Sequence, residues 1–573
     1  MLIDLYTPEG ENLSGTPWQV YPRPQMKRNS YINLNGQWEF GVGDNEPASY
    51  DKKIRVPFCP ESLLSGIHEH FPEGAGLWYR RSFALPDGFN RGRVLLHIGA
   101  ADQVADVYVN GKHVGHHEGG YEAFCFDITE ALAPENTLVI CCRDDLKDQS
   151  YPYGKQTLKR GGMWYTPVSG IWQTVWLESV PEMYIPKLNI ENRGSSVTID
   201  ICNPELSGSV TVGGLGTYVL NQGKVTITPE NPRFWSPEDP YLYEFSVEAG
   251  EDKVESYFAL RTLEIKKTGA YQRLCLNGKP YFFHGLLDQG YWSDGLFTPA
   301  APECYEKDIL AMKKLGFNTL RKHIKVEPEE FYYQCDKLGM VVFQDMVNNG
   351  DYSFLRDTAL PTVGFQKRDD RKLHRDAKTR SRFLQSMEST VNQLKNHPSI
   401  LYWTIFNEAW GQFDSDAVYE QMKQLDDTRF IDSTSGWFRR KKTDVDSRHI
   451  YFGPWGQLKP SRKPLVLSEF GGYCYAEKDH LFNPEKAYGY RTCKTREAFQ
   501  EELVKLYEQR IIPAVSKGLC ASIYTQVSDV EDEINGLLTY DRKVLKADAD
   551  TLLPIARALQ QAIKEEKTYV AKG

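Results

Sequence analysis

Short runs in which hydrophobic and polar residues alternate fill the first half of the chain. Runs such as Val104–Val109 are separated by turn residues up to about Pro181, and a second series continues over residues 184–262. Alternation with a period of two predicts β-strands that bury one face. Asn110–Gly111 joins two of these runs and predicts a two-residue hairpin, because a type I′ turn requires positive φ at both central positions. We therefore expect two β-sandwiches, the second small enough to be immunoglobulin-like.

After about Glu264 the pattern changes to apolar strands followed by amphipathic segments of helix length, which is typical of βαβ units. Strands are expected at 281–285, 318–321, 341–345, 400–406, 429–433, 449–452, 465–469 and 521–525. Helices are expected at 303–315, 328–338, 380–396, 416–426 and 498–516. Eight parallel strands are the number that closes a (β/α)8 barrel. The segment 438–447 is too short and too charged for a full helix, so we expect the barrel to be abbreviated there.

These patterns divide the 573 residues into three parts, which agrees with the usual limit on the size of a single hydrophobic core. The expected domains are a β-sandwich over residues 1–181, an immunoglobulin-like β-sandwich over 182–263 and a C-terminal (β/α)8 TIM barrel over 264–573. The net charge of −9 argues against nucleic acid as a partner. No membrane span is expected, and the absence of a visible export signal, with eleven scattered cysteines, predicts a cytoplasmic protein, although a mature exported form stays open.

Polar residues follow directly after three of the predicted barrel strands. Asn407-Glu408 ends the fourth strand, Glu469 ends the seventh and Asp345 ends the third. Active sites of barrels lie at the carboxyl ends of the strands, so these side chains should gather at one mouth. Two carboxyl groups about 5–5.5 Å apart are what glycoside hydrolysis with retention requires. The alternative is that each glutamate is a rim carboxylate that caps a helix or pairs with an arginine.

The residues around both glutamates resemble known motifs. Trp403–Glu408 and Leu467–Gly472 resemble the acid/base and nucleophile motifs of glycoside hydrolase family 2, which holds β-galactosidases, β-glucuronidases and β-mannosidases. Leu34–Trp38, Val107–Gly111 and Ser169–Gln173 are similar to that family's jelly-roll sugar-binding domain, and Phe234–Pro237 is similar to its immunoglobulin-like domain. The resemblance covers nearly the whole chain, and it implies a retaining exo-glycosidase that needs no metal and no cofactor.

The resemblance also implies roles for single residues. Glu408 would be the general acid/base, with a raised pKa, and Glu469 the ionised nucleophile. Asn407 would donate to the sugar 2-hydroxyl, and Arg321, at the end of the second strand, would keep the nucleophile charged. The remaining candidates for binding substrate are Asp288, Trp292, Asp345, Trp455, Tyr473 and Tyr524. Each of these weaker candidates could equally be a packing or rim residue.

Two features bear on the substrate. β-Glucuronidases of this family resemble one another in an Asn-x-Lys motif after the eighth strand, where this chain has Asn535-Gly536-Leu537. We therefore set glucuronides aside and expect a β-galactosidase, the commonest remaining activity of the family. An α-L-arabinofuranoside, a β-mannoside or a β-galacturonide would use the same two glutamates. The acidic run Asp529–Glu533 is interpreted as a solvated rim and not as a cation site.

Two other classes of function stay open. The chain could be a carbohydrate-binding protein without catalysis, although both glutamates are present. It could also be a structural assembly protein that uses the edge strands of its sandwiches. A glycoside or oligosaccharide is the expected partner, and a homo-oligomer is possible, because a neighbouring subunit could close the pocket.

Overall fold

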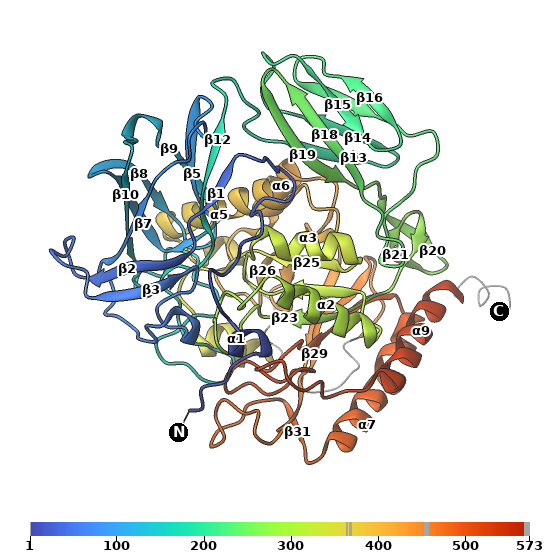
Figure 1. Cartoon of the computed structure of the whole chain (residues 1–573). Helices are drawn as coiled ribbons and strands as arrows, with labels where there is room; N and C mark the ends of the chain where they lie inside the picture. Colours follow the sequence, from blue (N-terminus) through green and yellow to red (C-terminus); the bar gives the residue numbers. More distant parts are fainter. Residues whose placement is uncertain (1, 363–364, 366–368, 452–457, 566–573) are drawn as a thin grey trace.

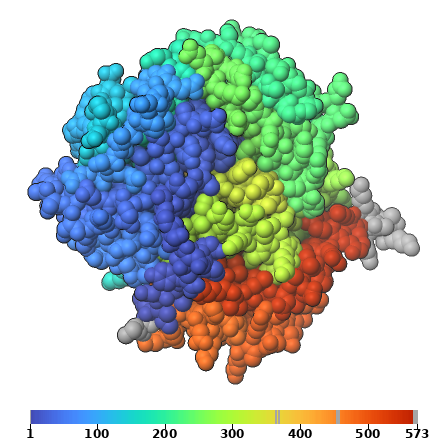
Figure 2. Space-filling model, viewed as in Figure 1, coloured from blue at the N-terminus to red at the C-terminus, as the bar shows by residue number. Residues whose placement is uncertain are grey.

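The computed structural model describes residues 2–362, 365, 369–451 and 458–565. Three parts follow one another along the chain (Figure 1), namely a first β-sandwich, a second smaller one and a C-terminal barrel. Figure 2 shows the blue first sandwich and the green second domain packed around the yellow-to-red barrel.

The first sandwich consists of two antiparallel sheets. One has the order β1 (Tyr31–Asn33), β12 (Val175–Val180), β5 (Arg93–Ile98) and β9 (Phe124–Asp127). The other has the order β3 (Lys52–Val56), β2 (Gly36–Val42), β4 (Leu77–Phe83), β10 (Asn136–Arg143), β7 (Val104–Val109) and β8 (Lys112–Glu118). Their inward side chains form one apolar core. Asn110 and Gly111 have φ of 53° and 79° and join β7 to β8, which confirms the predicted hairpin.

The second sandwich is smaller and follows the expected alternation. One sheet has the order β13 (Asn189–Arg193), β14 (Ser196–Asp200) and β17 (Lys224–Ile227), and the other β16 (Gly216–Val219), β15 (Gly208–Val212), β18 (Tyr243–Ala249) and β19 (Asp252–Phe258). Val197 and Ile199 are fully buried between the sheets, whereas Thr198 between them is partly exposed. A short sheet of β20 (Leu263–Thr268), β21 (Tyr271–Leu276) and β22 (Lys279–Pro280) leads into the barrel.

Eight parallel strands form the barrel, in the order β27-β26-β25-β24-β23-β32-β29-β28. They are β23 (Phe283–Asp288), β24 (Thr319–Lys322), β25 (Val341–Asp345), β26 (Ile400–Asn407), β27 (Phe430–Ser435), β28 (Asp446–Ile450), β29 (Leu465–Gly471) and β32 (Leu519–Thr525). All eight predicted strands are present, with ends that differ by a few residues. No ladder joins β27 to β28 among the described residues, so the sheet is nearly closed, and side-chain contacts such as Ser435 Oγ to Nε2 of His449 at 2.8 Å bridge this seam.

Helices cover the outside of the barrel. They are α2 (Glu303–Lys314), α3 (Glu329–Leu338), α5 (Ala377–Leu394), α6 (Ser415–Leu425), α7 (Arg496–Leu506) with the π-helical turn η6 (Tyr507–Ile511) and α8 (Ile512–Val515), and α9 (Ala549–Glu565). The described residues between β27 and β28 contain no helix, as expected from the sequence. Helix α9 was not among the predicted helices, although it buries Leu552, Ile555, Leu559 and Ile563 on one face.

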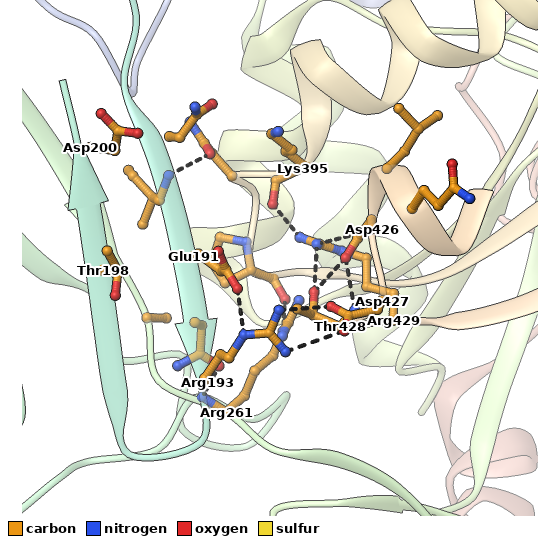
Figure 3. A pocket seen from close by; sticks show the side chains of 18 of the residues that line it. Glu191, Arg193, Thr198, Asp200, Arg261, Lys395, Asp426, Asp427, Thr428 and Arg429 are labelled. Atoms are coloured by element: carbon orange, nitrogen blue, oxygen red, sulfur yellow. Dashed lines mark hydrogen bonds and ion pairs between the residues drawn. The ribbon is translucent and has the colours of Figure 1, made fainter. Parts of the chain in front are cut away.

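The two sandwiches contact opposite ends of the barrel. The second sandwich lies at the amino ends of the barrel strands, where a cavity of about 390 Å³ separates it from the barrel (Figure 3). There Arg193 pairs with Asp427 at 2.9 Å, and Arg261 donates to the carbonyls of Pro398 and Ile400 at 2.7 and 3.0 Å. The first sandwich sends residues 144–169, which we call the mouth loop, over the carboxyl ends of the strands. Its Tyr153 donates its N–H to the carbonyl of Asn348, just beyond β25, at 3.1 Å.

Candidate functional site

Glu408 and Glu469 meet at the carboxyl end of the barrel. Glu408 directly follows β26, and Glu469 lies near the end of β29. One carboxylate oxygen of each and a ring nitrogen of His449 all lie within 4.8 Å of one another. The side chain of Glu408 is 20% exposed and that of Glu469 is 6% exposed. This spacing is close to the 5–5.5 Å between carboxyl groups that a double-displacement reaction at a sugar carbon uses.

Arg321, on β24, connects the groups around Glu469. Its guanidinium donates to Glu469 Oε1 at 2.9 Å, to Asp345 Oδ1 at 2.9 Å and to Asn407 Oδ1 at 2.9 Å. A fourth contact reaches the carbonyl of Ser468 at 3.0 Å. The planar fork of a guanidinium can serve several acceptors at once, so one buried cation fixes side chains from β25, β26 and β29.

Asp345 lies beneath this guanidinium and not on an open surface. One of its oxygens accepts from Arg321 and the other lies 2.7 Å from Nδ1 of His323. Its side chain is 1% exposed. The sequence predicted Asp345 as a substrate-binding residue, but the structure places it where it orients Arg321 and His323.

The surroundings of Glu469 favour its ionised form. Burial raises the pKa of this carboxyl group, but the positive charge of His449 and Arg321 outweighs burial and lowers the pKa to about 2. Tyr451 adds a hydrogen bond to Oε2 at 2.7 Å. Glu469 is therefore a carboxylate over the whole range of physiological pH.

His449 and Tyr451 were not predicted as site residues. Nδ1 of His449 lies 2.7 Å from Glu408 Oε1 and 3.6 Å from Glu469 Oε2, so the imidazole contacts both carboxylates. Polar residues that directly follow apolar strands were predicted as site residues, and β28 reads Asp-Ser-Arg-His-Ile, which is not apolar. The signal available was the spacing of two, which places both side chains on the same face at the end of this strand.

Backbone geometry explains the residues beside the glutamates. Glu408 and the following Ala409 have φ of 50° and 65°, a left-handed conformation that is strained for residues with a Cβ. On the other strand Gly471 and Gly472 have φ of 85° and 65°, and a Cβ at either would come within 2.3 Å of an aromatic ring, Tyr524 or Tyr490 respectively. Tyr490 stacks on Tyr451 with ring centroids 3.9 Å apart. The two glycines therefore make room for Tyr524 and for Tyr490, the ring that stacks on the tyrosine bonded to Glu469.

Several predicted substrate residues lie away from the pair of glutamates. Trp292 is 2% exposed and packs under Arg542, whose guanidinium lies 4.2 Å from its ring centroid. Tyr524 is fully buried beneath Gly471. Asp288 is paired with Lys322 at 2.7 Å. Packing holds Trp292 and Tyr524 in the barrel wall, and ion pairing holds Asp288 there.

Tyr473 and Trp455 are the last two of the predicted substrate-binding residues. Tyr473 is half-buried, with the guanidinium of Arg491 lying 5.3 Å from its ring centroid. Trp455 lies outside the described residues.

The acidic run Asp529–Glu533 is buried, so its interpretation as a solvated rim was wrong. Its five residues are at most 2% exposed. Glu533 accepts a hydrogen bond from Tyr165 of the mouth loop at 2.5 Å, and Glu531 accepts the N–H of Thr166 at 2.8 Å. Asp529 pairs with Lys546 at 2.6 Å. Glu531 and Glu533 are therefore docking points for the first sandwich, and their partners Thr166 and Tyr165 are far away in the sequence.

Among the described residues, Glu408, His449 and Glu469 have oxygen and nitrogen atoms close enough together to bind one metal ion. Both oxygens of Glu469 already accept hydrogen bonds from Arg321 and Tyr451. The donor set is therefore one that orients a carboxylate for attack on carbon.

Three family models match this chain. "Glycosyl hydrolases family 2, TIM barrel domain" matches residues 265–547, "Glycosyl hydrolases family 2" matches residues 185–261, and "Glycosyl hydrolase 2 galactose-binding domain-like" matches residues 70–161. The matches follow the order of the three parts of the structure.

Relatives and solved structures agree with these matches. A β-galactosidase of Thermoanaerobacter pseudethanolicus is 25% identical over 497 residues, which is 78% of this chain and 62% of that relative, so this chain spans about three fifths of its length. A β-D-glucuronidase structure from Dictyoglomus thermophilum has a TM-score of 0.72 at 20% identity over 95% of this chain and 98% of that one. A β-galacturonidase structure from Eisenbergiella tayi, bound to galacturonate, has a TM-score of 0.67 at 19% identity over 94% and 99%. None of the described helices combines the length and apolar character needed to cross a bilayer.

Proposed function

Because the chain belongs to glycoside hydrolase family 2, we propose that it removes a terminal sugar with retention, using Glu469 as nucleophile and Glu408 as general acid/base. The observation that carries this proposal is the approach of the two carboxylates to within 4.8 Å at the barrel mouth. The pKa of Glu469, lowered to about 2, supports the choice of which glutamate attacks.

In the first step a carboxylate oxygen of Glu469 forms a bond to the anomeric carbon while the bond to the aglycone oxygen breaks. Glu408 gives its proton to that oxygen, so the aglycone leaves as an alcohol. In the second step Glu408 takes a proton from water, whose oxygen attacks the same carbon and releases Glu469 as a carboxylate. Two inversions give net retention.

Asn407 is the residue we assign to the sugar 2-hydroxyl. Its Oδ1 accepts from Arg321 at 2.9 Å, which fixes the amide with Nδ2 on the other side. Among the described residues Nδ2 makes no hydrogen bond, so it is available to a substrate. A donor aimed at the 2-hydroxyl gains strength as positive charge develops on the sugar ring.

We assign a β-linked glycone of the galacto configuration, of which a β-D-galactoside is the simplest member. The Thermoanaerobacter relative named β-galactosidase and the Eisenbergiella structure named β-galacturonidase support this choice. Leu537, in place of the lysine of the Asn-x-Lys motif, argues against a glucuronide. The Dictyoglomus structure named β-D-glucuronidase makes glucuronides the competitor to include in any assay.

A panel of nitrophenyl glycosides tests the proposal, with β-galactoside, β-galacturonide, β-glucuronide, β-mannoside and α-L-arabinofuranoside compared for the purified chain. Glu469→Gln should abolish turnover on every substrate while binding of the product sugar persists. Glu469→Gly with azide should yield the α-glycosyl azide, whereas Glu408→Gly with azide should yield the β-anomer. Wild-type turnover by Glu469→Gln would refute the assignment, and sugar binding without any turnover by the wild type would favour the non-catalytic carbohydrate-binding class.

A further inference from the structure

The mouth loop brings a charged side chain of the first sandwich to the barrel mouth. This loop connects β10 to β11 (Gly170–Ile171) and is anchored at several points on the barrel. Tyr153 bonds to Asn348 beyond β25, and Tyr165 and Thr166 bond to Glu533 and Glu531 beyond β32. Lys155 lies between these anchors, so its backbone position is fixed.

Lys155 differs from the other cations near the mouth in its lack of a partner. Arg160 pairs with Asp532 at 3.0 Å, Lys322 with Asp288 at 2.7 Å and Lys325 with Glu327 at 2.9 Å. Among the described residues, Nζ of Lys155 makes no hydrogen bond and no ion pair, and its one described contact is the ring of Trp164, 6.0 Å from Nζ. The side chain is half-buried, so water screens its charge only in part.

The neighbours of Lys155 are the neighbours of the catalytic pair. Gly154 is packed so closely on the barrel that a Cβ there would lie 3.0 Å from the carbonyl of Ile324, which directly follows His323. On the other side Trp164 contacts Trp410, two residues after Glu408, with ring centroids 5.0 Å apart. The chain on either side of Lys155 is therefore held against the segments that follow β24 and β26, the strands that carry Arg321 and Asn407.

The charge of Lys155 also reaches this space. Burial raises the pKa of Glu533, and Tyr165 and Lys155 lower it, while the charge of Glu469 raises it. Burial lowers the pKa of His323. The charge of Glu469 raises this pKa, and the charge of Lys155 lowers it. Lys155 and the nucleophile thus act on the same two side chains, with opposite effects on the pKa of each.

We infer that Lys155 binds an anionic group on the glycone, so that the preferred substrate is a β-D-galacturonide. This inference rests on the proposed function and deepens it, because a galacturonide differs from a galactoside only in having a carboxylate at carbon 6. Among the described residues this cation has no hydrogen-bonded carboxylate, and the carboxylate of such a substrate would supply one. The same cation explains why Leu537 can stand where the Asn-x-Lys motif has its lysine, because the charge that binds the carboxylate then comes from the first sandwich.

Kinetics on a pair of substrates that differ only at carbon 6 tests this assignment. We compare nitrophenyl β-D-galacturonide with nitrophenyl β-D-galactoside for the wild type and for Lys155→Gln, Lys155→Arg and Lys159→Gln. The wild type should prefer the galacturonide, and Lys155→Gln should lower kcat/KM on it by about 100-fold while changing the galactoside by less than about threefold. Lys155→Arg should restore part of the loss because it keeps the charge. Lys159, an exposed residue of the same loop, is the matched control and should have no effect.

The outcomes separate this inference from the proposed function. If the wild type cleaves the neutral galactoside and Lys155→Gln lowers both substrates equally, Lys155 is only a counter-charge for Glu533 and the inference is wrong. A wild type that prefers the glucuronide and loses that preference in Lys155→Gln would keep the anion site but overturn the galacto configuration. If no glycoside in the panel is hydrolysed and Glu469→Gln changes nothing, the proposed function itself has failed.

Discussion

The two ends of the barrel each contain a buried arginine, and the partners of the two arginines differ. At the carboxyl end Arg321 donates to Glu469, Asp345 and Asn407. At the amino end, near the cavity shown in Figure 3, Arg261 donates to the carbonyls of Pro398 and Ile400. Burial lowers the pKa of Arg261 to about 9, and nearby Arg429 adds to this, whereas Asp345 and Glu469 overcome burial and raise the pKa of Arg321.

Burial alone does not identify a functional cation. Arg261 attaches the second sandwich to the barrel and orients nothing that could react. Arg321 fixes two carboxylates and an amide around one open space. What distinguishes a catalytic end from a structural end is that the buried cation is bonded to groups that can still meet a substrate.

Substitution of each arginine by lysine is the strongest test of this difference. Lysine keeps the charge but cannot serve acceptors on three strands, so Arg321→Lys should lower kcat/KM on the order of 10³-fold. Arg261→Lys should instead reduce the free energy of unfolding by about 1–3 kcal/mol, the cost of poorly satisfied buried carbonyls, and leave kcat/KM nearly unchanged. Steady-state kinetics and urea unfolding of both variants measure the two effects. An equal loss of turnover in folded Arg261→Lys would remove the distinction between the ends.

The acid stability of the carboxyl end should depend on Glu469. Its pKa falls from 4.5 to about 2 on folding, so its ionisation stabilises the folded chain above pH 4.5, and this contribution is lost as the pH falls from 4.5 towards 2. At 1.36 kcal/mol per unit the contribution is about 3 kcal/mol. Glu469→Gln, which resembles the neutral carboxyl, should therefore be less stable than the wild type at pH 7 and should approach it at pH 3.

Urea midpoints of the two proteins, measured by tyrosine and tryptophan fluorescence between pH 3 and pH 7, test this. A constant difference over that range would mean that the charge on Glu469 is not favoured by folding. Glu327, which is fully buried and ion-paired with Lys325, offers a comparison variant, Glu327→Gln, whose effect is expected on stability and not on glycoside turnover.

The sequence predicted the parts of the molecule that depend on local periodicity. Period-two alternation gave both sandwiches, and apolar strands followed by amphipathic segments gave the barrel. It also predicted Asn407, Glu408 and Glu469 at one mouth, because carboxyl ends of parallel strands converge. The position of Arg321 beside Glu469 was implied by the resemblance to family 2, and its guanidinium does donate to that carboxylate.

What the sequence did not predict depends on contacts between distant segments. The run Asp529–Glu533 looks solvated because it is acidic, and only the docking of Tyr165 and Thr166, more than 350 residues earlier, buries it. His449 was not predicted because β28 is polar. The burial of Trp292 and Tyr524 was not predicted either, because the direction of a side chain at a strand end depends on the register of the strand. Nothing in the local sequence marks Lys155, a loop residue of the first sandwich, as a neighbour of the barrel mouth.

The smallest expected effect concerns the hydrogen bonds that attach each sandwich to its end of the barrel. Tyr165→Phe removes the hydrogen-bond donor to one oxygen of Glu533, while Asn535 still donates to the other oxygen. Because the loop that carries Lys155 is then held less firmly, kcat/KM should fall about fivefold, which corresponds to about 1 kcal/mol. Arg193→Ala breaks an exposed ion pair at the opposite end and should change stability by less than about 1 kcal/mol and kinetics not at all. Galacturonide kinetics on both variants decide the matter, because an effect of Arg193→Ala as large as that of Tyr165→Phe would mean that both sandwiches influence the reaction only through overall stability.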